Sequence, residues 1–229
     1  DTYPDFKLKR EAFERVITPR TKAIIITTPS NPTGTVYSRD EIMLVVDICK
    51  KNNLLLISDE VYRTFVYDTE VESAVKYYEK TLLADGFSKA YGMPGWRMGY
   101  AAGPTELIER MAILQQWSFI CAPGPFQKAG IVALDTDMSA VIKEFHRRRD
   151  IVYETLKPKF NLVKPQGAFY VFPQAPGNNG SEFVKKAAQN NVLIVPGRAF
   201  SEQNTHFRIS YATSEVKLRR GLEILLKLA

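Results

Sequence analysis

The chain has 229 residues, of which 45% are hydrophobic and 24% are charged. These proportions are typical of globular proteins with a buried core, and they exclude a disordered chain. Thirteen glycines, thirteen prolines and two cysteines exclude collagen-like and disulfide-scaffold proteins as well. The net charge of +6, from 31 basic and 25 acidic residues, does not by itself indicate a nucleic-acid partner. The apolar runs are strand-length, well short of the ~20 residues that a membrane-spanning helix needs.

The first half of the chain alternates short apolar runs with helical patterns, which is typical of an α/β fold with a mainly parallel sheet. The apolar runs predict strands at residues 22–28, 54–58, 82–84 and 98–102. Helices are expected at residues 38–52, 104–116 and 125–134. Ser38 and Glu41 have the spacing of a capping box, and Ile42, Val45, Val46 and Cys49 fall on one face of the helix that follows.

The second half begins with one long amphipathic helix at residues 138–156 and then changes style. Strands are expected at residues 160–163, 167–172, 192–195 and 206–211, and helices at 181–189 and 214–228. We therefore predict a partial large α/β domain at residues 1–137, an interdomain helix at 138–158 and a small C-terminal α+β domain at 159–229.

The densest basic cluster consists of Lys143 and residues 146–149. Since no recognition-helix pattern accompanies it, we interpret it as the solvated face of a helix rather than a DNA-binding patch. Cys49 and Cys121 lie in apolar helical contexts and are expected to be buried thiols of a reducing compartment, which indicates the cytoplasm. Neither a metal site nor a membrane or nucleic-acid partner is expected.

Polar side chains lie beside the ends of the predicted strands, where an open parallel sheet binds its ligands. They are Asn31 after the first strand, Asp59 and Tyr62 after the second, Ser88 and Lys89 after the third, and Arg97 eight residues beyond Lys89. Taken singly, these motifs predict a turn, a helix cap, an exposed loop and a surface ion pair. Their occurrence together at one sheet edge favours a site.

The residue types suit one task. A desolvated lysine amine is a nucleophile towards an aldehyde, and an aspartate can keep a pyridine nitrogen protonated. A tyrosine hydroxyl and an asparagine amide can hydrogen-bond a phenolate oxygen, while an arginine with a serine hydroxyl can hold a phosphate. Together they predict a site for pyridoxal 5'-phosphate.

These motifs resemble those of the fold-type I, class I/II aminotransferases that depend on pyridoxal phosphate (the aspartate aminotransferase superfamily). The resemblance covers essentially the whole chain and includes residues 30–34, 58–62, 86–89, 95–100, 165–170, 196–200 and 207–210. It implies transfer of an amino group between an amino acid and a 2-oxo acid. It also implies a homodimer.

The resemblance implies a role for each site residue. Lys89 would form a Schiff base with the cofactor and move the substrate's α-proton, and Asp59 would pair with the pyridine nitrogen. Tyr62 and Asn31 would bond the phenolate oxygen, and Arg97 would bind the phosphate.

Arg208 would take the substrate α-carboxylate in a bidentate pair, for which a planar guanidinium is well suited. Asn31 would also lie beside the substrate. The Asn31–Pro32 peptide bond is expected to be cis, as the resemblance implies.

The sequence departs from the family pattern at Gly86, where some relatives carry a phosphate-binding serine; Ser88 is the candidate replacement. The chain opens at Asp1 and its first methionine is Met43, so we expect it to begin inside a longer protein. The family's N-terminal region supplies a glycine-rich phosphate loop, an aromatic stacked on the cofactor and the first strands. Without it, we expect weak cofactor binding, no activity and an unpaired sheet edge.

Two alternatives stay open. A β-lyase that cleaves a C–S bond would share the cofactor pocket, and a transcription regulator can carry an aminotransferase-like sensor domain without activity. Trp117 and Phe119 could line a substrate pocket, although a core role is favoured for such aromatics.

Overall fold

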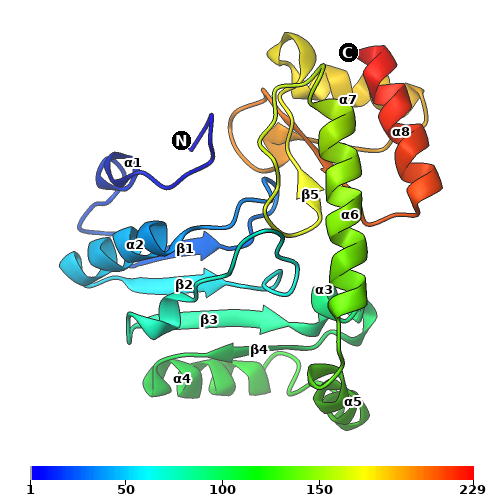
Figure 1. The fold of residues 1–229 in the computed structure, drawn as a ribbon. Coiled ribbons are helices and arrows are strands. Elements are labelled where there is room, and N and C mark those ends of the chain that lie inside the picture. Colours follow the sequence, from blue (N-terminus) through cyan, green and yellow to red (C-terminus); the bar gives the residue numbers. More distant parts are fainter. Residues whose placement is uncertain (1) are drawn as a thin grey trace. The chain divides into compact units, whose positions relative to one another are not determined.

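A computed structural model describes residues 2–229, which divide into two compact units. Unit 1 comprises residues 2–29, 36–64 and 70–138, and unit 2 comprises residues 30–35, 65–69 and 139–229. Unit 1 carries the strands β1–β4, and unit 2 carries the helices α6–α8 (Figure 1). Within the described residues, no helix combines the length and apolarity that crossing a membrane requires.

Unit 1 is built on a four-stranded sheet in the order β1-β2-β3-β4, and Figure 1 shows the four strands in this order from top to bottom. β1 (Ala23–Thr27), β2 (Leu55–Asp59) and β3 (Thr81–Gly86) are parallel, whereas β4 (Gly99–Ala102) runs antiparallel to β3. This confirms the predicted α/β class with its mainly parallel sheet.

One face of the sheet packs against α2 (Arg39–Lys51). Ile24, Ile26 and Leu56 meet the buried face of α2, and the predicted inward residues of that helix are all buried. The predicted capping box is present, because Ser38 accepts from the Glu41 amide while the Glu41 carboxylate accepts from the Ser38 amide. On the other face, Ile25 is 68% exposed, unusual for a parallel strand.

The remaining helices of unit 1 are short or lie at its surface. They are α1 (Arg10–Glu14), α3 (Phe87–Ala90), α4 (Thr105–Gln116), α5 (Gly124–Leu134) and the 3₁₀ turns at Ala74–Lys76 and Pro94–Trp96. No residue of α4 is buried among the described residues.

Three predictions of burial in this region are wrong. Trp117 is 86% exposed and Phe119 is 68% exposed, so neither belongs to a core of the described residues. Cys121 is exposed too, whereas Cys49 is buried in α2 as predicted. The reason is that Trp117, Phe119 and Cys121 lie in or beside the link between α4 and α5, where no described element covers these three side chains.

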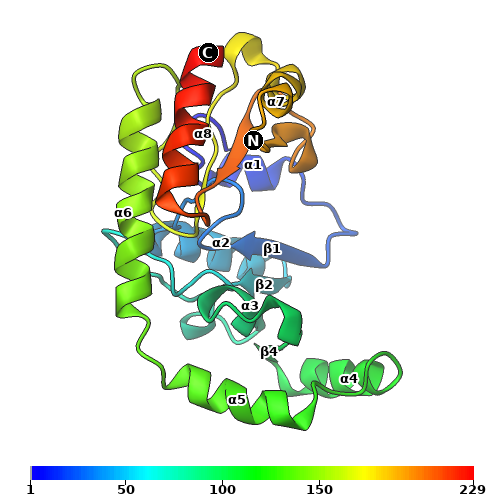
Figure 2. The same cartoon turned by 90° about the vertical axis from the view of Figure 1, so that its right-hand side faces the viewer.

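Unit 2 has one core formed by α6 (Ser139–Leu156), α7 (Gly180–Gln189), α8 (Glu215–Leu228) and a small sheet. The sheet has the order β5-β7-β6, with β5 (Tyr170–Val171), β6 (Val195–Pro196) and β7 (Phe207–Ser210) in antiparallel pairs. In both views α6 and α8 lie side by side (Figures 1 and 2). 3₁₀ turns occur at Pro176–Asn178 and Gly197–Ala199.

The strand predicted at residues 160–163 is wrong, because this segment has no strand partner and its Phe160 is buried between Phe183 and Phe207. The strand predicted at 192–195 begins only at Val195. The apolar residues of both segments pack into the core of unit 2. A short apolar run in the sequence is consistent with such a core segment as well as with a strand.

The interpretation of the basic cluster as a solvated face is wrong for Arg149, whose side chain is 1% exposed. Its guanidinium donates to the Pro165 carbonyl at 2.5 Å and to Asp68 at 2.6 Å, and it lies over the Tyr67 ring. The carboxylate of Asp150 completes its partners at 2.8 Å. Arg149 is therefore a structural cation that fastens residues 65–69 to α6.

Candidate active site

The strand register gathers the predicted site segments of unit 1 at one sheet edge. Thr27 pairs with Asp59 and Asp59 with Ala84, so the carboxyl ends of three parallel strands are level. β4 is antiparallel to β3, so its first residue, Gly99, pairs with Gly86 at that same edge. Consequently Arg97, which precedes β4, and Lys89, which follows β3, lie at the same edge of the sheet as the carboxyl end of β2.

Asp59, the last residue of β2, is half-buried. Burial raises the pKa of its carboxyl group, the charge of Asp85 raises it further, and a hydrogen bond from the Val61 amide at 3.2 Å opposes both. Within residues 2–229 no cation pairs with Asp59. A half-buried carboxylate of this kind is stabilised by a cationic partner such as a protonated pyridine nitrogen.

The Lys89 amine lies over the ring of Tyr62, with Nζ 5.8 Å from the ring centroid. Tyr62 is buried three residues after Asp59, and Lys89 is partly exposed on α3. The structure thus brings Lys89 and Tyr62 together and places both beside the edge that carries Asp59.

At Gly86, β3 and the beginning of β4 lie so close together that little room is left for a side chain. A Cβ atom on Gly86 would lie 3.1 Å from the Met98 carbonyl oxygen and 3.2 Å from the Gly99 Cα. The Phe87 amide donates to the same Met98 carbonyl. A serine at position 86 would therefore need the backbone to shift, which gives a physical reason for the departure from the family pattern.

Ser88 and Arg97 are the two predicted phosphate ligands. Ser88 is partly exposed and makes no hydrogen bond within the described residues. Arg97 is exposed, has a positive φ of 54° and donates only to the Pro94 carbonyl at 3.0 Å among residues 2–229. Its guanidinium has no carboxylate partner there, so its charge is available to an anion.

Arg208 of β7 lies in a second predicted part of the site, within unit 2. Its Nη1 donates to Asn31 Oδ1 at 2.8 Å, and its guanidinium carbon lies 4.5 Å from the Tyr170 ring centroid and 4.8 Å from that of Phe200. Its Nε is buried without a partner among the described residues. A buried N–H donor without an acceptor lowers the stability of the fold. The Arg208 guanidinium therefore has a donor left for a further hydrogen-bond acceptor.

The 30–35 turn holds Asn31 in place. Its Gly34 carbonyl accepts from the amides of Gln166 and Gly167, both at 2.8 Å, and Gly34 adopts a φ of +71°. A Cβ atom there would lie 2.6 Å from Pro165 Cβ and 2.7 Å from the Tyr170 carbonyl oxygen. The Asn31–Pro32 bond is cis, which confirms the prediction.

Sequence reasoning missed two contributors. Tyr170 is the last residue of the 165–170 motif but has no predicted role, because its ring contact with Arg208 depends on the β5–β7 pairing. Asp85 sits directly before Gly86, and its contacts with the site depend on the β3–β4 register. Short motifs signal neither, because both contacts join residues distant in sequence.

Comparison with known proteins decides the family. A family model described as aminotransferase class I and II matches residues 1–225. The chain belongs to this family. It is 39% identical, over 98% of its length, to a probable aspartate aminotransferase of Methanocaldococcus jannaschii, and 36% identical, over 96%, to aromatic-amino-acid aminotransferase 2 of Thermococcus litoralis.

Solved structures of this class I and II aminotransferase type agree with the fold. A crystal structure of aspartate aminotransferase from Thermotoga maritima superposes with a TM-score of 0.92 at 34% identity and covers 97% of the chain. The chain spans 63% of the M. jannaschii relative, 60% of the T. litoralis relative and 60% of the T. maritima structure.

Replacing Gly34 tests how the turn positions Asn31. Gly34→Ala adds both left-handed backbone strain and a clash, so we expect the free energy of unfolding to fall by about 2–5 kcal/mol. Gly177→Ala is the matched control, because Gly177 has a similar φ of +65° but open space around a Cβ. The control should lose only about 1–2 kcal/mol.

Urea unfolding of both variants of the complete protein measures the difference. Equal losses in the two variants would show that the contacts of Gly34 with Pro165 and Tyr170 do not constrain the turn.

Proposed function

We propose that the complete protein is an aminotransferase that uses pyridoxal phosphate to move an amino group between an amino acid and a 2-oxo acid. The observation that supports the proposal is the register of β2, β3 and β4, which puts the segments carrying Asp59, Lys89 and Arg97 at the same sheet edge. These residues offer a carboxylate without a cation, an amine and a guanidinium without a carboxylate.

The residues present fit the cofactor. Asp59 would hold the proton of the pyridine nitrogen, Tyr62 and Asn31 would hydrogen-bond the ring's phenolate oxygen, and Ser88 and Arg97 would hold the phosphate. Asn31 Oδ1 already accepts from Arg208, which leaves its amide group free to donate. When bound, pyridoxal phosphate supplies an electron sink that stabilises negative charge at the amino acid's α-carbon.

Lys89 is the proposed covalent anchor of the cofactor and the group that moves the α-proton of the amino acid at its Nζ. Its position over the Tyr62 ring supports this role, since the ring keeps the amine beside the group that would hold the phenolate oxygen. Protonated and neutral forms of an amine are both needed in such a proton transfer.

Arg208 is proposed to bind the substrate's α-carboxylate. Its buried Nε has no partner, and the rings of Tyr170 and Phe200 limit the directions in which the guanidinium can turn. A fixed planar guanidinium can bind a carboxylate in two parallel hydrogen bonds.

The side-chain preference of the substrate does not follow from the relatives. At similar identity they are named for aspartate, for aromatic amino acids and, at 40% identity, for a (5-formylfuran-3-yl)methyl phosphate. Residues 1–137 are proposed as the cofactor-binding part and residues 159–229 as the small domain, joined by the helix at 138–158. An exposed free thiol at Cys121 supports a reducing, cytoplasmic location.

The activity is tested with the complete protein loaded with pyridoxal phosphate. We expect absorption near ~420 nm from the lysine-bound cofactor, and Lys89→Ala should abolish it and slow the amino-acid half-reaction at least ~100-fold. Lys50→Ala, an exposed lysine in the last turn of α2, is the control and should behave like the wild type.

Product analysis separates transfer from its rivals. A 2-oxo acid with pyridoxamine phosphate left on the protein supports transfer, whereas pyruvate with ammonia would indicate a β-lyase. Cofactor binding without turnover of any amino acid would indicate a sensor.

We propose further that the complete protein is a homodimer. Six large apolar side chains on and between α4 and α5 are each at least 64% exposed: Leu114, Trp117, Phe119, Ile120, Ile131 and Val132. Monomeric proteins rarely expose so many large apolar side chains within one short stretch of chain, and a second copy of the chain can bury them.

Light scattering on the complete protein should give a mass of two subunits. Trp117→Glu, which places a charge on this surface, should shift the mass towards one subunit. A single-subunit mass for the wild type at micromolar concentration would contradict the dimer.

A further inference from the structure

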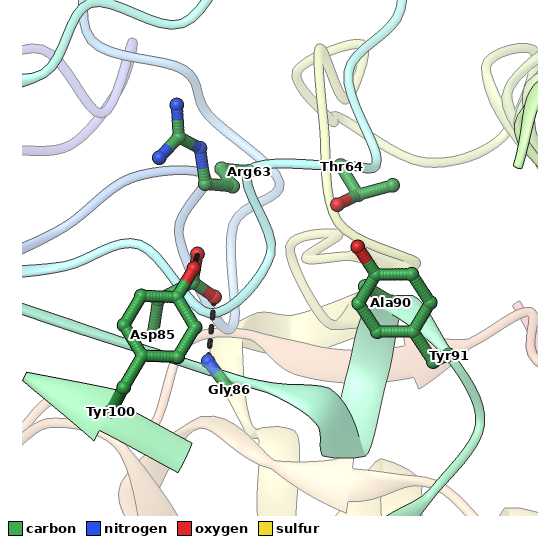
Figure 3. A pocket seen from close by; sticks show the side chains of 7 residues that line it. All are labelled: Arg63, Thr64, Asp85, Gly86, Ala90, Tyr91 and Tyr100. Atoms are coloured by element: carbon green, nitrogen blue, oxygen red, sulfur yellow. Dashed lines mark hydrogen bonds between the residues drawn. The ribbon is translucent and has the colours of Figure 1, made fainter. Parts of the chain in front are cut away.

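A small pocket beside the proposed Lys89 site contains a hydrogen-bond network around Asp85 to which the proposed function assigns no role. The pocket, of about 240 Å³, lies within unit 1, and its lining includes Arg63, Asp85, Gly86, Tyr91 and Tyr100. Figure 3 shows the Asp85 carboxylate between the Gly86 amide and the Tyr100 ring, with Tyr91 on the far side of the pocket.

Both oxygens of Asp85 are engaged. Oδ1 accepts from the Gly86 amide at 2.6 Å, and Oδ2 accepts from the Tyr100 hydroxyl at 2.8 Å. Asp85 and Tyr100 are also direct partners in the β3–β4 pairing. The single carboxylate therefore joins the end of β3 to the beginning of β4.

This junction lies between the two cationic residues of the proposed site. Lys89 follows Gly86 by three residues, at the end of the strand-to-helix turn, and Arg97 precedes Tyr100 by three residues. Short backbone segments of this length transmit a displacement at one end to the other. A change at the Asp85 carboxylate would thus alter the relative position of the amine and the guanidinium.

We propose that Asp85 is a positioning residue for the aminotransferase reaction. Through its hydrogen bond with Tyr100, it holds the turn that leads from β3 to Lys89 against β4, the strand that follows Arg97. Its carboxylate also places a negative charge near Asp59. The inference rests on the proposed function. It assigns no contact between Asp85 and the cofactor, so Asp85 acts through Gly86, Tyr100 and Asp59.

The charges around this sheet end support the electrostatic part. Burial raises the pKa of Asp59 and that of the fully buried Glu60, and the charge of Asp85 raises both further. The Glu60 carboxylate accepts hydrogen bonds from the hydroxyls of Ser58 and Ser73. Arg63 lies 3.9 Å from Glu60 as the nearest cation. Burial and the Asp85 bond raise the pKa of Tyr100 to about 12, so its hydroxyl remains a donor at neutral pH.

Two matched substitutions separate the geometric and the electrostatic effects. Asp85→Asn removes the charge and weakens the Tyr100 bond, whereas Tyr100→Phe removes the bond and keeps the charge. Tyr91→Phe is the control, because Tyr91 lines the same pocket and its hydroxyl makes no hydrogen bond within residues 2–229.

In the complete protein, we expect Asp85→Asn and Tyr100→Phe each to weaken pyridoxal phosphate affinity about 5- to 10-fold, as for loss of one partly exposed hydrogen bond. The double variant should lose less than the product of the two single effects, since both substitutions act on the same hydrogen bond. Tyr91→Phe should stay within about twofold of the wild type. Circular dichroism checks that each variant is folded, and Tyr100→Phe carries the test if Asp85→Asn does not fold.

The pH profile of kcat/KM gives a readout that a purely structural role would not move. Since the Asp85 charge raises the pKa of Asp59, Asp85→Asn should move the acid limb to lower pH, and Tyr100→Phe should not. Wild-type affinity in both single variants, or equal effects of Tyr91→Phe and Tyr100→Phe, would overturn the inference alone. Wild-type protein that binds no pyridoxal phosphate would overturn the proposed function and this inference together.

Discussion

The arrangement of unit 1 depends on the close approach of two strands at Gly86 and Gly99. A Cβ atom on Gly99 would lie 3.0 Å from the Asp85 carbonyl oxygen, and one on Gly86 would lie 3.1 Å from the Met98 carbonyl oxygen and 3.2 Å from the Gly99 Cα. Because β4 is antiparallel to β3, residues 87–98 reverse the direction of the chain at the sheet edge where β2 ends in Asp59. Lys89 lies three residues after Gly86, and Arg97 lies two residues before Gly99. The distance between these two side chains therefore depends on the register of β3 and β4.

A comparable constraint operates in unit 2. The Gly34 carbonyl accepts two amides from residues 166 and 167, which holds Asn31 against Arg208. The guanidinium is flanked by aromatic rings and keeps one buried N–H unpaired. In both units, backbone contacts at glycines therefore position cationic side chains. The guanidinium groups of Arg97 and Arg208 each keep hydrogen-bond donors that no described residue uses.

Most of the α/β half could be predicted from sequence because its signals are local. The capping box of Ser38 and Glu41 and the buried face of α2 follow from residue spacing alone. The burial of Arg149 could not be predicted, since its partners Asp68 and Pro165 are distant in sequence. The exposure of Trp117 was likewise missed, because residue type indicates burial only where another element covers the side chain.

The proposed function requires one lysine, Lys89, to bond the cofactor. The direct measurement is borohydride reduction of the complete protein loaded with pyridoxal phosphate, followed by proteolysis and mass spectrometry of the peptides. We expect a stable pyridoxyl group on Lys89, because reduction fixes the carbon–nitrogen bond of its amine. A pyridoxyl group on another lysine, or on none, would contradict it.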